Sequence, residues 1–297
     1  MRARTGQAYD AEIEQHYRRM AEEFGLSPAS TMADEITRHL ETTAILDFVR
    51  VALDARTAEE RKRPATIADI GCGNGYTLGR LLERYPDQRF VGVEKSDELR
   101  ALALSRFQPD GRVTITAGDV RNPDFSAPGS ADIIICQRVL INLLESGDQK
   151  RALENIVTVL RDGPAGGAGG KCLFIEAFTR YLVTLNGARA EFELPTILPA
   201  HHNLYLPDDF FLIPQLRPFE RPGIAPPNFL STHYYVTRVL HPAVTANKPV
   251  KRNSEFVRFF SEALNQHVGD YSPLRLCSFE KIREPMAGST PSSPSRQ

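Results

Sequence analysis

A glycine-rich turn between a short apolar run and an amphipathic stretch constrains the fold of this chain more than any other feature. The run at 67–70 (IADI) is typical of a buried strand end, whereas Leu78, Leu81 and Leu82 share one face of a predicted helix. The intervening turn at 71–75 (GCGNG) is rich in glycine, which permits positive φ angles and lets another group approach the backbone closely. A strand, such a turn and a helix N-terminus together form a binding site for a nucleotide-like ligand.

Short apolar runs alternate with amphipathic helical patterns from residue 66 onwards. Strands are predicted at 66–70, 89–94, 113–117, 131–136 and 172–178, and helices near 75–85, 97–107 and 147–160. This alternation predicts an α/β fold, with a doubly wound, mostly parallel sheet covered by helices on both faces. The run GPAGGAGG at 163–170 is interpreted as a flexible surface loop before the fifth strand.

The segments around this core have a different character. Two amphipathic helical patterns, at 10–24 and 32–53, precede it and lead into a charged linker. Residues after 178 are rich in Pro, His, Tyr and Phe, and an alternating run at 274–282 then predicts a final strand. The predicted division has an N-terminal helical lid and linker at 1–63, a ligand-binding core at 64–178, a substrate cap at 179–272, the final core strand at 273–284 and a disordered tail at 285–297.

Composition argues against several classes of partner. The 297 residues contain 36 Lys and Arg against 37 Asp and Glu. The chain therefore lacks the excess of basic residues that is typical of a nucleic-acid-binding protein. No run approaches the roughly 18 apolar residues that a membrane-spanning helix needs, and the start of the chain lacks the apolar region of a signal peptide. Widely separated cysteines with no C-x-x-C pair indicate reduced thiols in a cytoplasmic protein. Composition leaves the oligomeric state open.

Polar residues follow several predicted strands, at the edge where open α/β sheets bind ligands. Glu94 ends the second strand, where a carboxylate can accept hydrogen bonds from two ribose hydroxyls. Asp119 and Val120 follow the third strand, and a carboxylate beside an apolar side chain suits an adenine amino group and ring face. The fourth strand leads into Gln137 and Arg138. These residues predict one binding site at the carboxyl edge of the sheet.

In these residues the sequence resembles the class I S-adenosylmethionine-dependent methyltransferases, whose glycine motif D/E-x-G-x-G-x-G matches residues 69–75 in full. The resemblance covers roughly residues 60–178 and implies a Rossmann-like methyltransferase fold of seven strands with an antiparallel final strand. It also implies S-adenosyl-L-methionine as cofactor, bound by Asp69, Gly71, Gly73, Asn74, Gly75, Glu94, Asp119, Val120 and Gln137. Carboxylates suit the positive sulfonium and amine of this cofactor but would repel the pyrophosphate of a nicotinamide cofactor. A nicotinamide-dependent oxidoreductase would also prefer G-x-G-x-x-G, which the turn does not provide.

The residues after the fourth strand bear on the methyl acceptor. The N/D/S-P-P-Y/F run of amino-methylating DNA enzymes is absent from 136–144 (CQRVLINLL). That stretch, with 202–206 and 231–238, is similar to bacterial small-molecule methyltransferases, including enzymes encoded with polysaccharide genes, which implies O-methylation of a saccharide or another small-molecule hydroxyl. Asp208 and Asp209, considered as magnesium ligands, are interpreted instead as the start of a helix, so no metal site is expected. Another small metabolite, a protein, RNA or a role as a non-catalytic binding module stay open as alternatives.

A hydroxyl acceptor must lose a proton, and a positioned base contributes typically ~10²–10⁴-fold. His201 and His202 lie in the predicted cap, and we expect His202 to be the base because polar neighbours could orient its ring. Helix capping or backbone contacts are the structural alternative for this pair. Glu176, a carboxylate in an apolar run, is a third candidate as base, substrate ligand or partner of an arginine.

Three further residues are candidate substrate ligands. Arg138 could grip an acidic acceptor, with a salt bridge to a neighbouring acid as the alternative. His233 and Tyr235 lie in an aromatic run that could contact the acceptor or stack on a sugar ring, although such runs more often form ordinary core. His233 is also the next candidate base after His201 and His202.

Overall fold

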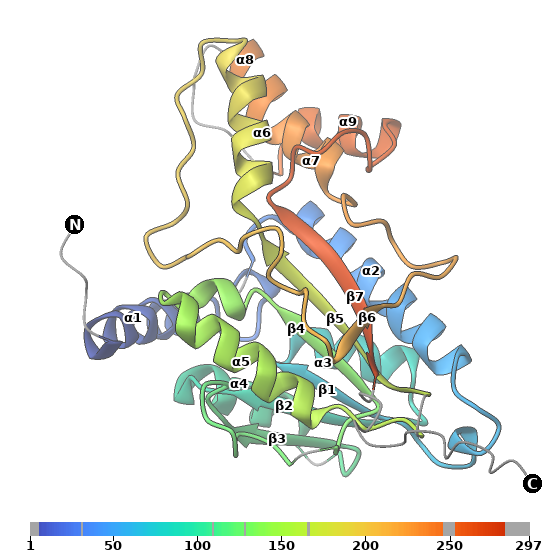
Figure 1. Cartoon of the computed structure of the whole chain (residues 1–297). Helices are drawn as coiled ribbons and strands as arrows, with labels where there is room; N and C mark the ends of the chain where they lie inside the picture. The colour runs from blue at the N-terminus through green and yellow to red at the C-terminus, as the bar shows by residue number, and fades with distance from the viewer. Residues whose placement is uncertain are drawn as a thin grey trace, which may run out of the picture.

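The computed structural model describes residues 6–30, 32–108, 110–127, 129–164, 167–245 and 253–282, which form one seven-stranded sheet with helices on both faces (Figure 1). The strands are β1 (Thr66–Ile70), β2 (Arg89–Glu94), β3 (Val113–Ala117), β4 (Ile133–Gln137), β5 (Ala168–Ala177), β6 (Leu216–Pro218) and β7 (Leu274–Ile282). Their order is β3-β2-β1-β4-β5-β7-β6. β1 to β5 pair in parallel, and β7 runs antiparallel to β5 and β6. The predicted doubly wound α/β sheet with an antiparallel final strand is confirmed.

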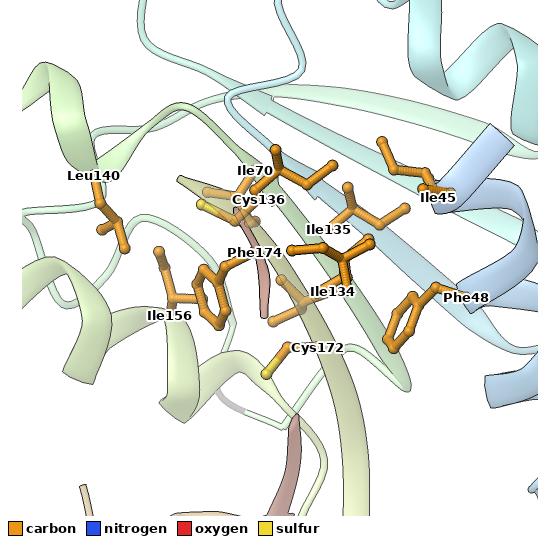
Figure 2. Close-up of a cluster of buried hydrophobic side chains, with 14 of the residues drawn as sticks. Ile45, Phe48, Ile70, Ile134, Ile135, Cys136, Leu140, Ile156, Cys172 and Phe174 are labelled. Atoms are coloured by element: carbon orange, nitrogen blue, oxygen red, sulfur yellow. The ribbon is translucent and has the colours of Figure 1, made fainter. Parts of the chain in front are cut away.

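Helices cover this sheet from both sides. The helices are α1 (Gly6–Phe24), α2 (Glu35–Asp54), α3 (Tyr76–Arg84), α4 (Asp97–Phe107), α5 (Ser146–Val159), α6 (Thr179–Ala190), α7 (Ser231–Tyr235), α8 (His241–Val244) and α9 (Glu255–Ala263). Ile45 and Phe48 of α2 pack on one side of the central strands, and Ile156 of α5 packs on the other (Figure 2). Because both faces are covered, the central strands are continuous apolar runs and do not alternate.

The structure corrects the prediction of a flexible loop at 163–170. β5 begins at Ala168, so Gly169 and Gly170 are buried strand residues. A Cβ atom at Gly169 would lie 2.3 Å from the carbonyl oxygen of Arg161. Close packing of backbone against backbone, which glycine permits, therefore explains this part of the run.

The segment predicted as a substrate cap also contributes to the sheet. Within this inserted segment (residues 179–272), β6 pairs with β7 at the sheet edge. β6 has only three residues and contains Pro218, so it carries no alternating pattern and was not predicted. The helix predicted to begin at Asp208 and Asp209 is absent, because both residues lie in a turn.

The two N-terminal helices pack in different ways. Phe48, Val49 and Ala52 of α2 are fully buried in the core beneath the sheet. α1 contacts α4 and the 3-10 turn at Pro28–Ser30 instead, and it lies over the carboxyl edge of the strands. The predicted tail at 285–297 lies outside the described residues.

Candidate active site

The glycine turn after β1 has the backbone geometry that its sequence indicates. Gly71, Gly73 and Gly75 have φ angles of 72°, 57° and 77°, in the left-handed region that favours glycine. A Cβ atom at Gly71 would lie 2.4 Å from Val139 Cγ2, and one at Gly75 would lie 2.6 Å from Phe107 Cε2. The turn therefore requires glycine for close packing as well as for its conformation.

Asn74, in the same turn, faces the N-terminal segment. Its Nδ2 atom donates to the carbonyl oxygens of Gly25 and Ser27, both at 3.0 Å, and to Ser30 Oγ at 2.9 Å. These bonds tie the glycine turn to the residues that follow α1. Asn74 lines a small cavity beneath the turn but not the main cavity described next.

A cavity of about 150 Å³ lies at the carboxyl ends of β1 to β4 and beneath α1. The predicted cofactor and substrate residues that line it are Gly71, Gly73, Glu94, Asp119, Val120, Gln137 and Arg138. α1 supplies Asp10, Ile13, Glu14 and Tyr17 to the same lining. The structure therefore brings Gly71 and Arg138, which are 67 positions apart in the sequence, to the same cavity. It also adds α1 to the lining, a helix that sequence analysis predicted only as a lid.

The two acids at the strand ends have different environments. Glu94 accepts hydrogen bonds from the backbone N–H groups of Gly73 and Ser96, both at 2.8 Å, while burial raises its pKa. Burial also acts to raise the pKa of Asp119, but hydrogen bonds from Arg121 outweigh it and lower that pKa. Arg121 lies 2.5 Å from Asp119 and 3.1 Å from Asp10, so it joins α1 to this edge of the site.

A second cavity of about 40 Å³ adjoins the first, and Gly71, Gly73, Gln137 and Arg138 line both. Asp69 lies in its wall, where burial and then the nearby charge of Glu94 raise its pKa to about 7. Gln137 Nε2 is buried and has no hydrogen-bond partner among the described residues. An acid and an amide donor beside a glycine turn fit the ammonium and carboxylate of an amino-acid group, and Glu94 fits ribose hydroxyls.

A polar network that sequence analysis missed includes Tyr17 and Asn142, which line the part of the main cavity that we term its inner end. Asn142 Nδ2 donates to the Tyr17 hydroxyl at 2.5 Å, and Asn203 Nδ2 donates to Asn142 Oδ1 at 2.8 Å. Burial raises the pKa of Tyr17 to about 12, so its hydroxyl stays protonated. The network joins α1, the loop after β4 and the inserted segment. No signal in the sequence marks it, because Tyr17 belongs to the apolar face of a helix and the partners are distant.

Glu176 holds the loop after β4 and does not line the cavity. Its carboxylate is fully buried and accepts hydrogen bonds from the N–H groups of Val139 at 2.9 Å, Leu140 at 3.0 Å and Ile141 at 3.1 Å. These groups begin the 3-10 helix Leu140–Asn142. The position corrects the expectation of a base or substrate ligand, because a carboxylate occupied by three backbone donors serves to shape the loop.

Arg138 begins that loop in a strained conformation. Its φ of 55° is unusual for a residue with a side chain, and its guanidinium forms an ion pair with the buried Glu41 of α2. Arg138 also lines both cavities. Arg138 therefore forms a salt bridge with a neighbouring acid and also lines the candidate site.

The paired histidines contact α1 but do not line the cavity. His202 stacks on His16 with ring centroids 4.3 Å apart, and burial, followed by the neighbouring His16 and His201, lowers its pKa to about 4. Nδ1 of His202 is buried and has no partner among the described residues. His201 is exposed, with Nε2 3.4 Å from Glu12. In this arrangement neither ring reaches the cavity.

His233 and Tyr235 are also remote from the cavity lining. His233 is fully buried, with Nε2 3.0 Å from both carboxylate oxygens of Asp34 and Nδ1 3.2 Å from Ser261 Oγ. Asp34 is the N-cap of α2, so this contact fixes the start of that helix. Tyr235 packs on Tyr271 with centroids 4.7 Å apart. The aromatic run thus packs against other parts of the fold, and neither residue lines the main cavity.

The described ranges contain neither a cluster of metal-ligating side chains nor a helix suited to a membrane. Within them, no group of three or more His, Cys, Asp and Glu side chains could hold a metal ion. In the same part of the chain, no helix combines the length and the apolar character needed to cross a membrane.

Comparison with known proteins identifies the class of the core. A sequence model described as a methyltransferase domain matches residues 67–163, the part that carries the glycine turn and both strand-end acids. The matched residues thus form a methyltransferase domain. S-adenosylmethionine is the methyl donor of this class, in agreement with the glycine motif and the seven-stranded sheet.

Several relatives share part of the methyltransferase domain. Trans-aconitate 2-methyltransferase of Streptomyces avermitilis is 39% identical over 70 residues, which are 23% of this chain and 26% of that protein. Ribosomal RNA small subunit methyltransferase H of a Synechococcus strain is 32% identical over 103 residues, 34% of this chain and 32% of that one. The chain thus spans about a quarter to a third of the length of these curated relatives.

Solved structures match over longer stretches but at low similarity. Magnesium protoporphyrin IX methyltransferase from Synechocystis, with bound S-adenosylhomocysteine, is 11% identical, covers 93% of this chain and 97% of that one, and gives a TM-score of 0.47. An amino pentose methyltransferase from Micromonospora echinaspora is 26% identical over 45% of this chain and 48% of that one, with a TM-score of 0.35.

Proposed function

We propose that the protein transfers a methyl group from S-adenosylmethionine to a small-molecule acceptor. The observation that carries this proposal is the single lining shared by the glycine turn, Glu94, Asp119 and Gln137. When bound, the cofactor supplies a methyl group on a positively charged sulfur, which is a good leaving group. Alignment of the acceptor by the protein can then supply much of the rate acceleration.

The residues that would hold the cofactor follow from the donors and acceptors around the two cavities. The backbone of the glycine turn, Asp69 and Gln137 fit its amino-acid end. Glu94 fits the ribose, and Asp119 with Val120 fits the adenine end. Carboxylates at these positions also favour a positively charged ligand.

We propose that the acceptor is a hydroxyl, as on a saccharide, placed at the inner end of the cavity. Tyr17 and Asn142 present a hydroxyl and an amide there, which can orient a polar acceptor by hydrogen bonds. Ile13 and Leu143 add apolar surface to the same lining. We propose His202, which is neutral at pH 7, as the base, with a movement of α1 bringing its ring towards the cavity.

A second candidate acceptor is a carboxylate. Arg138 lines the cavity and can bind an anion, because its guanidinium is a fixed bidentate donor. A carboxylate is already ionised at neutral pH and needs no base, which suits a cavity that neither His201 nor His202 lines. The name of the S. avermitilis relative, trans-aconitate 2-methyltransferase, includes an acid of this kind.

The two acceptors can be separated with one matched pair of sugars. Methyl glucoside and methyl glucuronide share a ring and differ in a carboxylate, and each is incubated with the full chain and S-adenosylmethionine. A mass gain of one methyl group on either sugar that survives mild alkali supports hydroxyl methylation. A gain only on the glucuronide that alkali removes indicates a methyl ester and supports the second candidate. Absence of any product from a wider panel, together with absence of cofactor binding in calorimetry, would overturn the proposal.

A further inference from the structure

A second and larger cavity lies on the other side of the inserted segment. This groove of about 590 Å³ is lined by the start of α6, by residues from the stretch 208–227 and by residues 275–279 of β7. Its volume falls in the range of roughly 300–1,000 Å³ that is common for small-molecule pockets. None of its lining residues lines the cofactor cavity.

A strip of the inserted segment separates the groove from the cofactor cavity. The N–H of Leu204 donates to Ile141 O at 2.7 Å, and the N–H of Leu206 donates to Ala177 O at 2.8 Å. Thr179 N–H donates in turn to Leu206 O at 3.1 Å. Because the strip is bonded to the loop after β4 on one side and to the end of β5 on the other, the two cavities have separate walls.

Aromatic rings from separate elements form one wall of the groove. Phe211 lies 5.3 Å from Phe279 of β7 and 6.2 Å from Phe178, measured between ring centroids. Leu212 stands at the groove with 84% of its surface exposed, which is unusual for a large apolar side chain beside an aromatic wall. A flat apolar molecule would cover both features.

Arginine side chains supply positive charge at the same groove. Arg275 is only 8% exposed, stacks over the Tyr181 ring at 4.0 Å and pairs through Nη1 with Asp270 at 2.5 Å. Its Nε is buried and lacks a hydrogen-bond partner among the described residues. Arg180 and Arg221 also line the groove, against the acids Asp208 and Glu220. A buried guanidinium donor without an acceptor favours an anionic group on the ligand.

We propose that this groove binds a small aromatic carboxylate, at a site distinct from the methyl-transfer cavity. The ring system of the ligand stacks on the aromatic wall, and Arg275 binds its carboxylate. Binding is non-covalent, because burial raises the pKa of the Cys277 thiol in the groove to about 12 and keeps it protonated. The site depends on the fold of the groove alone, so it stands whether or not the acceptor assignment holds.

Calorimetry with 2-naphthoate tests the site, with the neutral 2-naphthamide as a probe of matched shape. We expect one saturable site for 2-naphthoate, at least about tenfold weaker binding of the amide, and no change when S-adenosylhomocysteine is present. Leu212→Glu places a negative charge at the groove and should weaken 2-naphthoate binding at least about tenfold. Leu198→Glu is the matched control, since Leu198 is 77% exposed in the same inserted segment but does not line the groove.

Three outcomes would overturn the proposal. The first is the absence of saturable binding of 2-naphthoate to the parent protein. The second is the failure of either matched comparison: equal affinity for the amide would show binding that does not use the groove's positive charge, and equal effects of the two leucine variants would show binding outside the groove. The third is competition by S-adenosylhomocysteine, which would place the naphthoate in the cofactor cavity.

Discussion

Replacement of Glu176 by glutamine tests how the protein holds the loop after β4, which carries Arg138 and Asn142 to the cavity. The carboxylate is fully buried and accepts hydrogen bonds from three backbone N–H groups of this loop. Burial raises its pKa from the ordinary 4.5 to about 7, although those N–H groups act in the opposite direction. The charged form is therefore disfavoured in the folded protein despite its hydrogen bonds.

The size of the effect follows from this pKa. A tenfold change in proton affinity is worth about 1.4 kcal/mol, so a rise from 4.5 to about 7 corresponds to roughly 3 kcal/mol. Because the folded-state pKa is raised, this stability is fully present below pH 4.5 and is lost as pH rises through about 7. Glu176→Gln removes that pH-dependent contribution. It adds a constant cost of about 1–3 kcal/mol, because the N–H of Ile141 loses its carboxylate acceptor.

Urea denaturation at several pH values between about 5 and 8 gives the free energy of unfolding of each protein. Across this range we expect the parent to lose up to about 3 kcal/mol relative to Glu176→Gln. Glu154→Gln, on the exposed side of α5, is the matched control and should follow the parent. Parallel pH profiles for the parent and Glu176→Gln would refute the reasoning about this buried carboxylate.

Three further variants test the cavity. Gly71→Ala, with a φ of 72° and a Cβ 2.4 Å from Val139, should weaken S-adenosylmethionine binding at least about tenfold in calorimetry. Gly111→Ala, whose Cβ meets nothing within 4 Å, should bind normally, and equal affinities would contradict the role of the turn. Tyr17→Phe should lower the free energy of unfolding by about 1 kcal/mol and reduce kcat; an unchanged kcat would show that the network does not orient the acceptor. His202→Gln should cut kcat by ~10²–10⁴ at unchanged cofactor affinity, and more than about a third of the parent kcat would exclude His202 as the base. The pKa of His202 is lowered from 6.5 to about 4, so the parent should lose stability as pH falls through that window, and the variant should lose less.

The central part of the fold could be predicted because each of its elements carries a local signal. β1, β2 and β3 match their predicted bounds, since strands covered on both faces form uninterrupted apolar runs between turn residues. β7 was equally clear from alternation, because one of its faces is partly open to the groove. The glycine turn was recognisable because backbone conformation and close approach both restrict it to glycine.

Features that depend on distant contacts could not be predicted. β6 is a strand because it pairs with β7, and Gly169 is buried against the backbone of residues 161–163. The partner of His233 is Asp34, which lies 199 residues away, so the sequence could not separate this histidine from one that faces a ligand. Propensity and periodicity describe neighbours along a chain, whereas a buried polar group is defined by the group that satisfies it.

The cavity also bears on which part of the N-terminal region moves. A volume of about 150 Å³ is below the roughly 300–1,000 Å³ typical of small-molecule pockets, so admission of a cofactor and an acceptor requires one wall to open. α2 is a poor candidate, because its apolar face is buried in the core and its start is fixed by the contact between Asp34 and His233. α1 is held at the cofactor edge by partly exposed ion pairs, such as Asp10 with Lys95 at 3.2 Å, each worth about 0–1 kcal/mol. We infer that α1 alone is the lid, and that its release separates Tyr17 from Asn142 and opens the inner end of the cavity to the acceptor.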